Sequence, residues 1–282
     1  MQTINTNSAQ GIGVGNGSAY FSLGSPLWRQ CTEGPHAKDT YSYAPGHGSD
    51  DVEMATMNMA RWGNNPEEKW YSASMRLDMA LGFGAYEQSL KVGVGSGVTT
   101  TFYLSEEKAD RLQEIDFEFS GYCVKPGEHG ANHGAGCSTS WVWTNVWWKE
   151  NQYGNRTPLW TGSKPSPTPD TTQGWERSVY RYKIDWEPEF VKWSVDLTGT
   201  GNSYQCIRKQ DMGAIGAAYD ERLCYPFISF WSDWTPDGSP FDKEGKDATA
   251  RCGASGACYQ AFYFQPLKFT PSSKNRITRV GS

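Results

Sequence analysis

The sequence lacks long hydrophobic runs and has little of the periodicity that marks amphipathic helices. No stretch of about 18 apolar residues occurs, so no transmembrane helix is expected. The formal net charge of -5 gives no reason to expect a polyanionic partner such as nucleic acid. No internal repeat and no low-complexity linker divides the chain. We therefore expect one domain over residues 1–282, with poorly packed tails at 1–19 and 272–282.

The seven cysteines include no pair of CxxC elements, which argues against a structural zinc site. Three pairs could close loops or join neighbouring strands: Cys123 with Cys137, Cys206 with Cys224, and Cys252 with Cys258. Their connectivity stays open, and Cys31 would be left over. Such disulfides are typical of oxidising compartments. The first ten residues lack the basic and apolar segments of a signal peptide, so we expect a mature secreted domain.

Aromatic residues and glycine are abundant, with 13 Trp, 15 Tyr and 31 Gly. Aromatic segments interrupted by glycine and proline are typical of short strands joined by many turns. We expect an all-β fold, with loops over 122–140 and 151–174. So many tryptophans suggest a sugar-binding cleft as well as a core, because flat ring faces match the C–H faces of sugar rings.

The most informative segment is 114–119, EIDFEF, in which three acids alternate with three large apolar residues. Alternate side chains of a strand share a face, so Glu114, Asp116 and Glu118 would point away from the core together. Adjacent carboxylates repel one another, and the repulsion is costly where water is excluded. A solvated acidic face or a calcium site are the other interpretations, although strand spacing places three acids poorly around one ion.

Catalysis gives this repulsion a use. Retaining glycoside hydrolysis needs a carboxylate nucleophile and a second carboxyl that carries a proton. Repulsion between like charges raises one pKa and so keeps a proton in the site. A middle aspartate can hydrogen-bond the nucleophile and tune it. The segment therefore predicts a pair of catalytic carboxyls, Glu114 and Glu118, with Asp116 between them.

EIDFEFSG, at 114–121, resembles the ExDxE signature of glycoside hydrolase family 16. The form without an extra residue before the last acid resembles licheninases, xyloglucan endotransglycosylases and fungal cell-wall transglycosylases. Further segments resemble strands of that family in the same order, and together they span roughly residues 65–270. These segments are FGAYEQSLKVGVGSGVTTTFYLS at 83–105, TNVW at 144–147, YRYKIDWEPEFVKWSVD at 180–196 and PFISFWSDW at 226–234.

The resemblance implies a β-jelly-roll sandwich of two curved antiparallel sheets with a substrate cleft on the concave face. By motif position it implies Glu114 as the nucleophile, Asp116 as the assisting acid and Glu118 as the general acid/base. It also implies a set of substrate-binding residues: Glu87, Asn145, Trp147, Trp231 and Trp234.

The function that we expect is retaining endo-hydrolysis of a β-glucan-type polysaccharide, either mixed-linkage β-1,3-1,4-glucan or xyloglucan. A transglycosylase would form the same glycosyl-enzyme intermediate and pass it to a sugar acceptor, and the sequence does not separate the two. A non-catalytic carbohydrate-binding jelly roll would have no reason to keep three repelling acids. The loops at 122–140 and 155–174 leave endo or exo action open.

No cofactor is expected. His129 and His133 lie four residues apart, but in a glycine-rich loop, so the helical HExxH arrangement of zinc proteases does not apply. Some members of the family carry a structural calcium on the convex face, for which the sequence shows no ligand set. We expect a secreted monomer whose partner is a polysaccharide, with neither a membrane nor a nucleic acid as partner.

Overall fold

The computed structural model describes thirteen stretches of the chain, and every statement about structure below concerns these residues. They are 12–15, 17–31, 41–44, 53–62, 70–71, 73–93, 98–106, 113–124, 136–149, 151–158, 179–217, 223–232 and 255–274. Within them the fold is all β, with two antiparallel sheets and no helix. Accordingly, none of these stretches provides a helix suited to crossing a bilayer. The all-β jelly roll expected from the sequence is confirmed.

The larger sheet contains ten described strands and is built around the long strand β17. Its main path runs β1 (Ile12–Gly15), β2 (Ser18–Phe21), β17 (Ser255–Pro271), β8 (Gly84–Lys91), β13 (Tyr180–Trp186), β14 (Phe190–Asp196) and β15 (Gln205–Asp211). The remaining strands branch from β17 through β5 (Met54–Trp62), which also pairs with β4 (Tyr41–Ala44) and β6 (Trp70–Tyr71). β17 therefore has two successive partners on one side, β5 and then β2.

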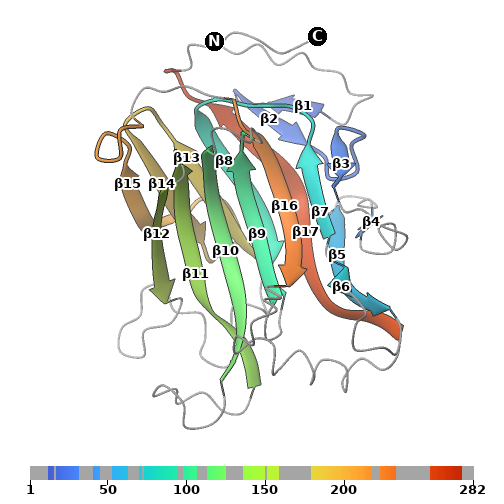
Figure 1. Ribbon diagram of the computed structural model, residues 1–282. Helices are drawn as coiled ribbons and strands as arrows, with labels where there is room; N and C mark the ends of the chain where they lie inside the picture. Colours follow the sequence, from blue (N-terminus) through green and yellow to red (C-terminus); the bar gives the residue numbers. More distant parts are fainter. Residues whose placement is uncertain are drawn as a thin grey trace.

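The smaller sheet contains seven described strands and lies in front of the larger one in Figure 1. Its order is β12 (Asn151–Pro158), β11 (Gly136–Trp148), β10 (Gln113–Val124), β9 (Val98–Ser105), β16 (Tyr225–Ser232), β7 (Ala73–Leu77) and β3 (Trp28–Gln30). The acid-rich segment 114–119 belongs to β10, an inner strand of the sheet, which β11 and β9 hold in register from both sides.

The core lies between the two sheets and is largely aromatic. Phe117 and Phe119 of β10 meet the ring of Tyr182 of β13 edge-on, with centroids 5.5 and 4.7 Å apart. The hydroxyl of Tyr263 on β17 donates to the carbonyl oxygens of Thr101 and Ser229 at 2.9 Å, which ties the larger sheet to β9 and β16. Large buried rings therefore fill the space between the sheets, and the Tyr263 hydroxyl is hydrogen-bonded across it. The outer faces of the two sheets lie outside this core.

Two of the expected loops are partly strands. β10 continues to Val124 and β11 begins at Gly136, so their hairpin extends into the segment 122–140. Residues 151–158 form the edge strand β12, with Pro158 at its last position. Proline is tolerated at the end of an edge strand, where no ladder hydrogen bond is lost. The irregular sequence of this segment hid a strand that is stabilised by pairing with β11.

The pairing of Cys206 with Cys224, which the sequence left open, does not form. Cys206 is exposed on β15, at the edge of the larger sheet, whereas Cys224 is buried beside Leu81. Both are free thiols, and so is Cys31. Cys123 and Cys137 lie opposite each other in the register of β10 and β11. Cys252 lies outside the described residues.

Candidate active site

Alternation along β10 divides its side chains between the core and the outer face of the smaller sheet. Ile115, Phe117 and Phe119 are fully buried against the larger sheet. Glu114, Asp116 and Glu118 therefore share the opposite face, as the sequence predicts. The main chain beneath them is held from behind, because the indole N–H of Trp193 on β14 donates to the carbonyl oxygen of Asp116 at 2.9 Å.

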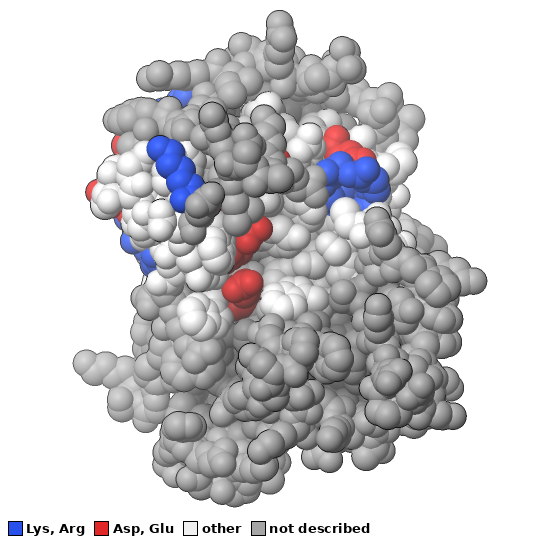
Figure 2. All heavy atoms as spheres, viewed as in Figure 1, with Lys and Arg blue, Asp and Glu red and all other residues white. Residues whose placement is uncertain are grey.

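The three carboxyls line one pocket of about 310 Å³ on this face. Figure 2 shows acidic side chains in a hollow near the middle of the face formed by the smaller sheet. The pocket is formed by side chains of β10 and of the strands on one side of it, β9, β16 and β7. Its lining residues are Ala73, Ser74, Thr101, Tyr103, Glu114, Asp116, Glu118, Ser229 and Trp231. Such a concave site with converging polar groups is a default candidate for catalysis or binding.

Asn145, on the neighbouring strand β11, connects two of the carboxyls. It lies opposite Asp116 in the register of the two strands. Its backbone N–H donates to Asp116 Oδ1 at 3.0 Å, and its side-chain Nδ2 donates to Glu118 Oε2 at 3.1 Å. Asn145 has no exposed surface. It therefore acts on the carboxyls and has no surface to offer a sugar, although the sequence assigns it to substrate binding.

Burial and mutual repulsion keep protons in this site. Burial, together with the charge of Glu118, raises the pKa of Glu114 to about 7. Burial, followed by the charges of Glu118 and Glu114, raises the pKa of Asp116 well above its ordinary value. The three carboxyls therefore carry fewer than three negative charges near neutral pH.

The second carboxyl oxygen of Asp116 lacks a hydrogen-bond donor within the described part of the chain. Oδ2 is buried, and no described residue donates a hydrogen bond to it. A neutral carboxyl can instead donate through that oxygen to a neighbouring carboxylate. A hydrogen bond from Asp116 lowers the pKa of Glu114, against the larger effect of burial. The arrangement favours a neutral Asp116 that stabilises negative charge on Glu114.

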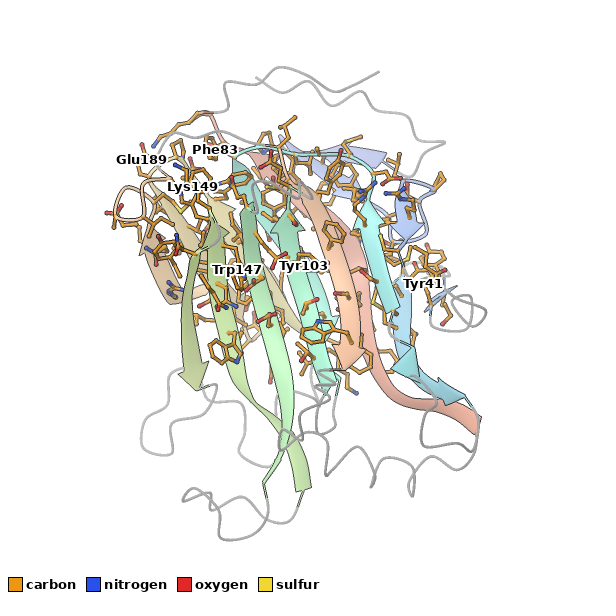
Figure 3. The ribbon with its side chains drawn as sticks, in the orientation of Figure 1. Tyr41, Phe83, Tyr103, Trp147, Lys149 and Glu189 are labelled. Carbon is orange, nitrogen blue, oxygen red and sulfur yellow. The ribbon has the colours of Figure 1, made fainter. Side chains whose placement is uncertain are left out.

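Two of the three tryptophans predicted for the cleft lie on the face that carries the carboxyls. Trp231 lines the pocket from β16. Trp147 lies opposite Glu114 in the register of β10 and β11, on the same face. In Figure 3, Trp147 and Tyr103 come from the strands on either side of β10. Trp234 lies outside the described residues.

Glu87 is the predicted substrate-binding residue that lies apart from the carboxyls. It belongs to β8 in the larger sheet, and its side chain lines a different pocket. There Glu87 Oε1 pairs with Lys268 Nζ at 2.7 Å, and Glu87 Oε2 accepts a hydrogen bond from the Tyr204 hydroxyl at 2.6 Å. The sheet to which a strand belongs depends on long-range pairing, which the alternation of its residues does not reveal.

The sequence reading missed several residues that line the pocket or share its face. Tyr103 lies opposite Asp116, and Thr101 lies opposite Glu118. The Thr101 hydroxyl and the Ser229 hydroxyl are 2.5 Å apart and form a hydrogen bond. Trp143 of β11 lies on the other side of Glu118, on the same face. Period-2 alternation in TTTFYLS and WVWTNVWW was the available signal, but it required the register of the strands to be known.

Arg208 supports this face from the far sheet. Its guanidinium lies over the ring of Trp193, 5.1 Å from the centroid. It donates to the carbonyl oxygens of Thr144 on β11 and Tyr153 on β12, the latter at 3.1 Å. The planar fork of an arginine can serve both strands at once. The strand that carries Asn145 is thus held from both its neighbour and the opposite sheet.

No group of three or more His, Cys, Asp or Glu residues in the described part of the chain is arranged to hold a metal ion. His129 and His133 lie outside the described residues. The chemistry that the described site can offer is that of its three carboxyls, of which Glu114 and Asp116 have raised pKa values.

Comparison with known proteins identifies the wider group. The family model described as "Glycosyl hydrolases family 16" matches residues 37–242. No curated protein sequence matches the chain. A β-1,3-1,4-glucanase (lichenase) structure derived from a mouse hindgut metagenome is similar, with 13% identity, a TM-score of 0.54, and coverage of 90% of this chain and 98% of that one.

Two further solved structures share the fold. A β-glucanase from Bacillus licheniformis has 14% identity and a TM-score of 0.52, and the match covers 91% of this chain and 99% of that one. The laminarinase catalytic domain from Thermotoga maritima MSB8 has 14% identity and a TM-score of 0.55, with coverage of 89% and 94%. At these identities the likeness shows the fold alone.

Proposed function

The chain belongs to glycosyl hydrolases family 16, and we propose that it is a retaining endo-glycosidase that cleaves a β-glucan-type polysaccharide. The observation that carries the proposal is the convergence of Glu114, Asp116 and Glu118 in one pocket, in the motif order that resembles the family signature. A module that only bound sugars would gain nothing from three adjacent carboxyls, two of which have pKa values raised by burial and by the charge of their neighbours.

The reaction would proceed in two displacements. A Glu114 oxygen forms a bond to the anomeric carbon while the glycosidic C–O bond breaks, and Glu118 gives its proton to the leaving oxygen. Glu118 then removes a proton from water, and that water oxygen displaces Glu114 from the anomeric carbon. The electron pair of the broken bond stays with the leaving oxygen in the first step and with the Glu114 carboxylate in the second. Each step inverts the anomeric carbon, so the two steps together retain its configuration.

This mechanism requires a proton on Glu118 and negative charge on Glu114 in the substrate complex. In the free site, burial raises the pKa of Glu114 to about 7, and the Asn145 amide donates to Glu118. Positive charge that develops on the sugar ring next to Glu114 favours its anionic form. Substrate binding would therefore have to move the proton of the coupled site to Glu118 before the glycosidic bond breaks.

For the substrate we propose mixed-linkage β-1,3-1,4-glucan or xyloglucan. The similar structures described above are named as a lichenase, a β-glucanase and a laminarinase, which are enzymes that degrade β-glucans. Trp147 and Trp143 of β11 and Trp231 of β16 lie on both sides of the carboxyl row. Rings on both sides suit a chain of sugar units that crosses β10 and continues beyond the pocket.

We also propose that the protein acts outside the cell as a monomer without a cofactor. A polysaccharide outside the cell is too large to cross a membrane unaided, so an enzyme that cleaves it has to be outside the cell as well. Cys123 lies opposite Cys137 in an antiparallel pair, where Cα atoms are typically about 4.5–5.5 Å apart, within the range that a disulfide spans. A disulfide there would fit an oxidising compartment.

The experiment that tests the function is product analysis on barley β-glucan, xyloglucan, laminarin and carboxymethyl cellulose. We expect wild type to shorten one of the glucans internally, and Glu114→Gln and Glu118→Gln to lose this activity by several orders of magnitude. Glu189→Gln, which removes an exposed acid paired with Lys274, should retain it. Products longer than the substrate would indicate a transglycosylase. Binding without any change of length would contradict the proposal.

A further inference from the structure

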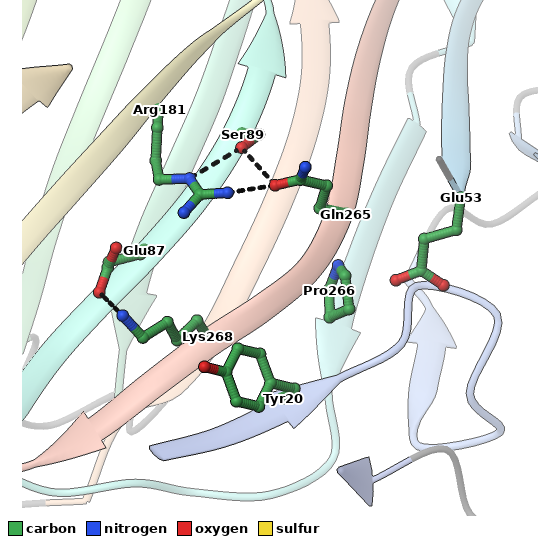
Figure 4. A pocket seen from close by; sticks show the side chains of 8 residues that line it. All are labelled: Tyr20, Glu53, Glu87, Ser89, Arg181, Gln265, Pro266 and Lys268. Atoms are coloured by element: carbon green, nitrogen blue, oxygen red, sulfur yellow. Dashed lines mark hydrogen bonds and ion pairs between the residues drawn. The ribbon is translucent and has the colours of Figure 1, made fainter. Parts of the chain in front are cut away.

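A second polar pocket lies on the outer face of the larger sheet, on the other side of the sandwich from the carboxyls. Its volume is about 380 Å³. Tyr86 and Leu90 of β8 face the core and are fully buried, so Glu87 and Ser89 between them face outward. The lining residues are Tyr20, Glu53, Glu87, Ser89, Arg181, Gln265, Pro266 and Lys268 (Figure 4).

The pocket lies where β17 changes partner. β17 pairs with β5 as far as Phe264 and with β2 from Leu267. Its register with β8 is interrupted between Phe264 and Lys268, so the intervening residues bulge from the sheet. Gln265, within this bulge, has a positive φ of 62°. A non-glycine residue in this conformation is strained and persists only when its surroundings hold it there.

A buried amide holds the bulge from the core side. Gln88 has no exposed surface, and its Nε2 donates to the carbonyl oxygens of Ser89 and Phe264 at 3.1 Å and of Gln265 at 3.4 Å. These carbonyls lie where the ladder between β8 and β17 is interrupted. Gln88 Oε1 has no hydrogen-bond partner among the described residues, so the donor side of the amide alone holds the bulge. The pocket is thus a preformed feature of the fold.

The polar groups of the pocket are ordered by one another. Arg181 Nε donates to Ser89 Oγ at 3.3 Å, and the Arg181 guanidinium also donates to Gln265 Oε1. Lys268 Nζ pairs with Glu87 at 2.7 Å on the other side (Figure 4). Two cationic and two acidic side chains line the pocket, which makes its formal charge zero. The pocket therefore offers both donors and acceptors, and its balanced charge favours neither an anion nor a metal cation.

We propose that this pocket is a second, non-catalytic saccharide-binding site that takes a neutral sugar unit. A sugar presents hydroxyls that both donate and accept, which Arg181, Lys268 and Glu87 can satisfy, and a C–H face that the ring of Tyr20 can cover. The choice of a β-glucan as its source rests on the proposed function. Binding there would raise the local concentration of polymer around the enzyme.

Two variants separate this site from the carboxyl pocket. Tyr20→Ala removes the ring, and Arg181→Gln removes the guanidinium but keeps an amide. Lys192→Gln on β14 is the matched control, because Lys192 pairs with Asp185 on the same sheet and does not line the pocket. Thermal unfolding of each variant would show whether it is folded. All three are made in wild type and in the Glu118→Gln background, where the polymer is not consumed.

The test is retardation in native gels that contain barley β-glucan, xyloglucan or laminarin. We expect Glu118→Gln to be retarded by one polymer, the retardation to fall several-fold with Tyr20→Ala and Arg181→Gln, and Lys192→Gln to change nothing. With the active enzyme, the same two variants should raise KM for the polymer but leave kcat and KM for a short aryl oligosaccharide unchanged.

Unchanged retardation and unchanged polymer KM in both folded variants would overturn the second site. So would retardation by none of the three polymers. Failure of the catalytic proposal is a different outcome, in which retardation depends on Tyr20 and Arg181 but wild type cleaves nothing.

Discussion

Asn145 donates from its side-chain Nδ2 to Glu118 Oε2 at 3.1 Å, although the two residues lie on neighbouring strands and 27 positions apart. The backbone N–H of the same residue donates to Asp116 Oδ1 at 3.0 Å. One fully buried residue thus positions two of the three carboxyls. Hydrogen bonds to a carboxylate stabilise its anionic form, so Asn145 also influences which carboxyl holds a proton.

Asn145→Ala should lower kcat with little loss of folding, because the backbone hydrogen bond to Asp116 remains. A hydrogen bond to a charged group contributes about 1.5–3 kcal/mol, which corresponds to roughly a 10- to 100-fold loss. Steady-state kinetics on the polymer that wild type cleaves would measure it. Asn151→Ala is the control, since the Asn151 side chain donates to the nearby Lys149 carbonyl. A kcat equal to wild type would remove Asn145 from the positioning role.

Gly154→Ala should impair activity from outside the pocket. A Cβ at Gly154 would lie 2.1 Å from Asn145 Oδ1, so the Asn145 amide would have to move. Overpacking costs about 1–3 kcal/mol of stability, and small displacements of catalytic groups can cost about 100-fold in rate. Asn151→Ala, at an exposed position of the same strand opposite the buried Trp148, should be neutral. Activity and urea unfolding measured on both variants check this, and equal kinetics for the two would contradict it.

Glu114→Gln should stabilise the protein at alkaline pH. In the folded state the pKa of Glu114 is raised from an ordinary 4.5 to about 7, so the folded state binds the proton more tightly than the unfolded state. Wild type therefore loses stability as pH rises from about 4.5 to 7, by up to about 3 kcal/mol. Glutamine does not titrate and avoids this loss. The comparison is urea unfolding at pH 4 and pH 8.

The gain from Glu114→Gln over wild type should be larger at pH 8 than at pH 4. Glu189→Gln, which replaces an exposed glutamate, should show no comparable change between the two pH values. A Glu114→Gln variant whose stability relative to wild type is the same at both pH values would show that Glu114 titrates normally.

Trp147→Ala should weaken substrate binding. Trp147 is partly exposed and shares the face of Glu114 on the adjoining strand. Losing the burial of a large side chain costs about 1.5–3 kcal/mol, so KM should rise roughly 10- to 100-fold with a smaller effect on kcat. Lys149→Ala, which changes an exposed side chain just beyond β11, serves as the control. An unchanged KM would exclude Trp147 from the sugar contacts.

The sequence predicted the face of β10 correctly because one strand carries all the information needed. The apolar residues at 115, 117 and 119 can only face the core, so the acids between them must share the other side. Neighbouring strands were harder to place. The register of β10, β11 and β12 places Asn145 opposite Asp116 and Gly154 opposite Asn145. One strand alone does not reveal this register.

Glu87 shows the same limit at the level of sheets. Its strand was correctly recognised, but the alternation of GAYEQSLK does not reveal whether β8 belongs to the sheet with the carboxyls or to the other one. Pairing with β17, about 180 positions later, decides this. The bulge at Gln265 was equally hidden, since it depends on a hydrogen-bonding glutamine that lies far away in the sequence.

The most direct test of the account is the configuration of the sugar azide formed by Glu114→Ala and Glu118→Ala from a dinitrophenyl β-glycoside of a β-glucan oligosaccharide in sodium azide. Azide replaces whichever carboxylate is missing. We predict an α-glycosyl azide from Glu114→Ala and a β-glycosyl azide from Glu118→Ala, identified by proton NMR. The reversed pair of products would exchange the two roles, and folded variants that turn over like wild type without azide would contradict the catalytic assignment of Glu114 and Glu118.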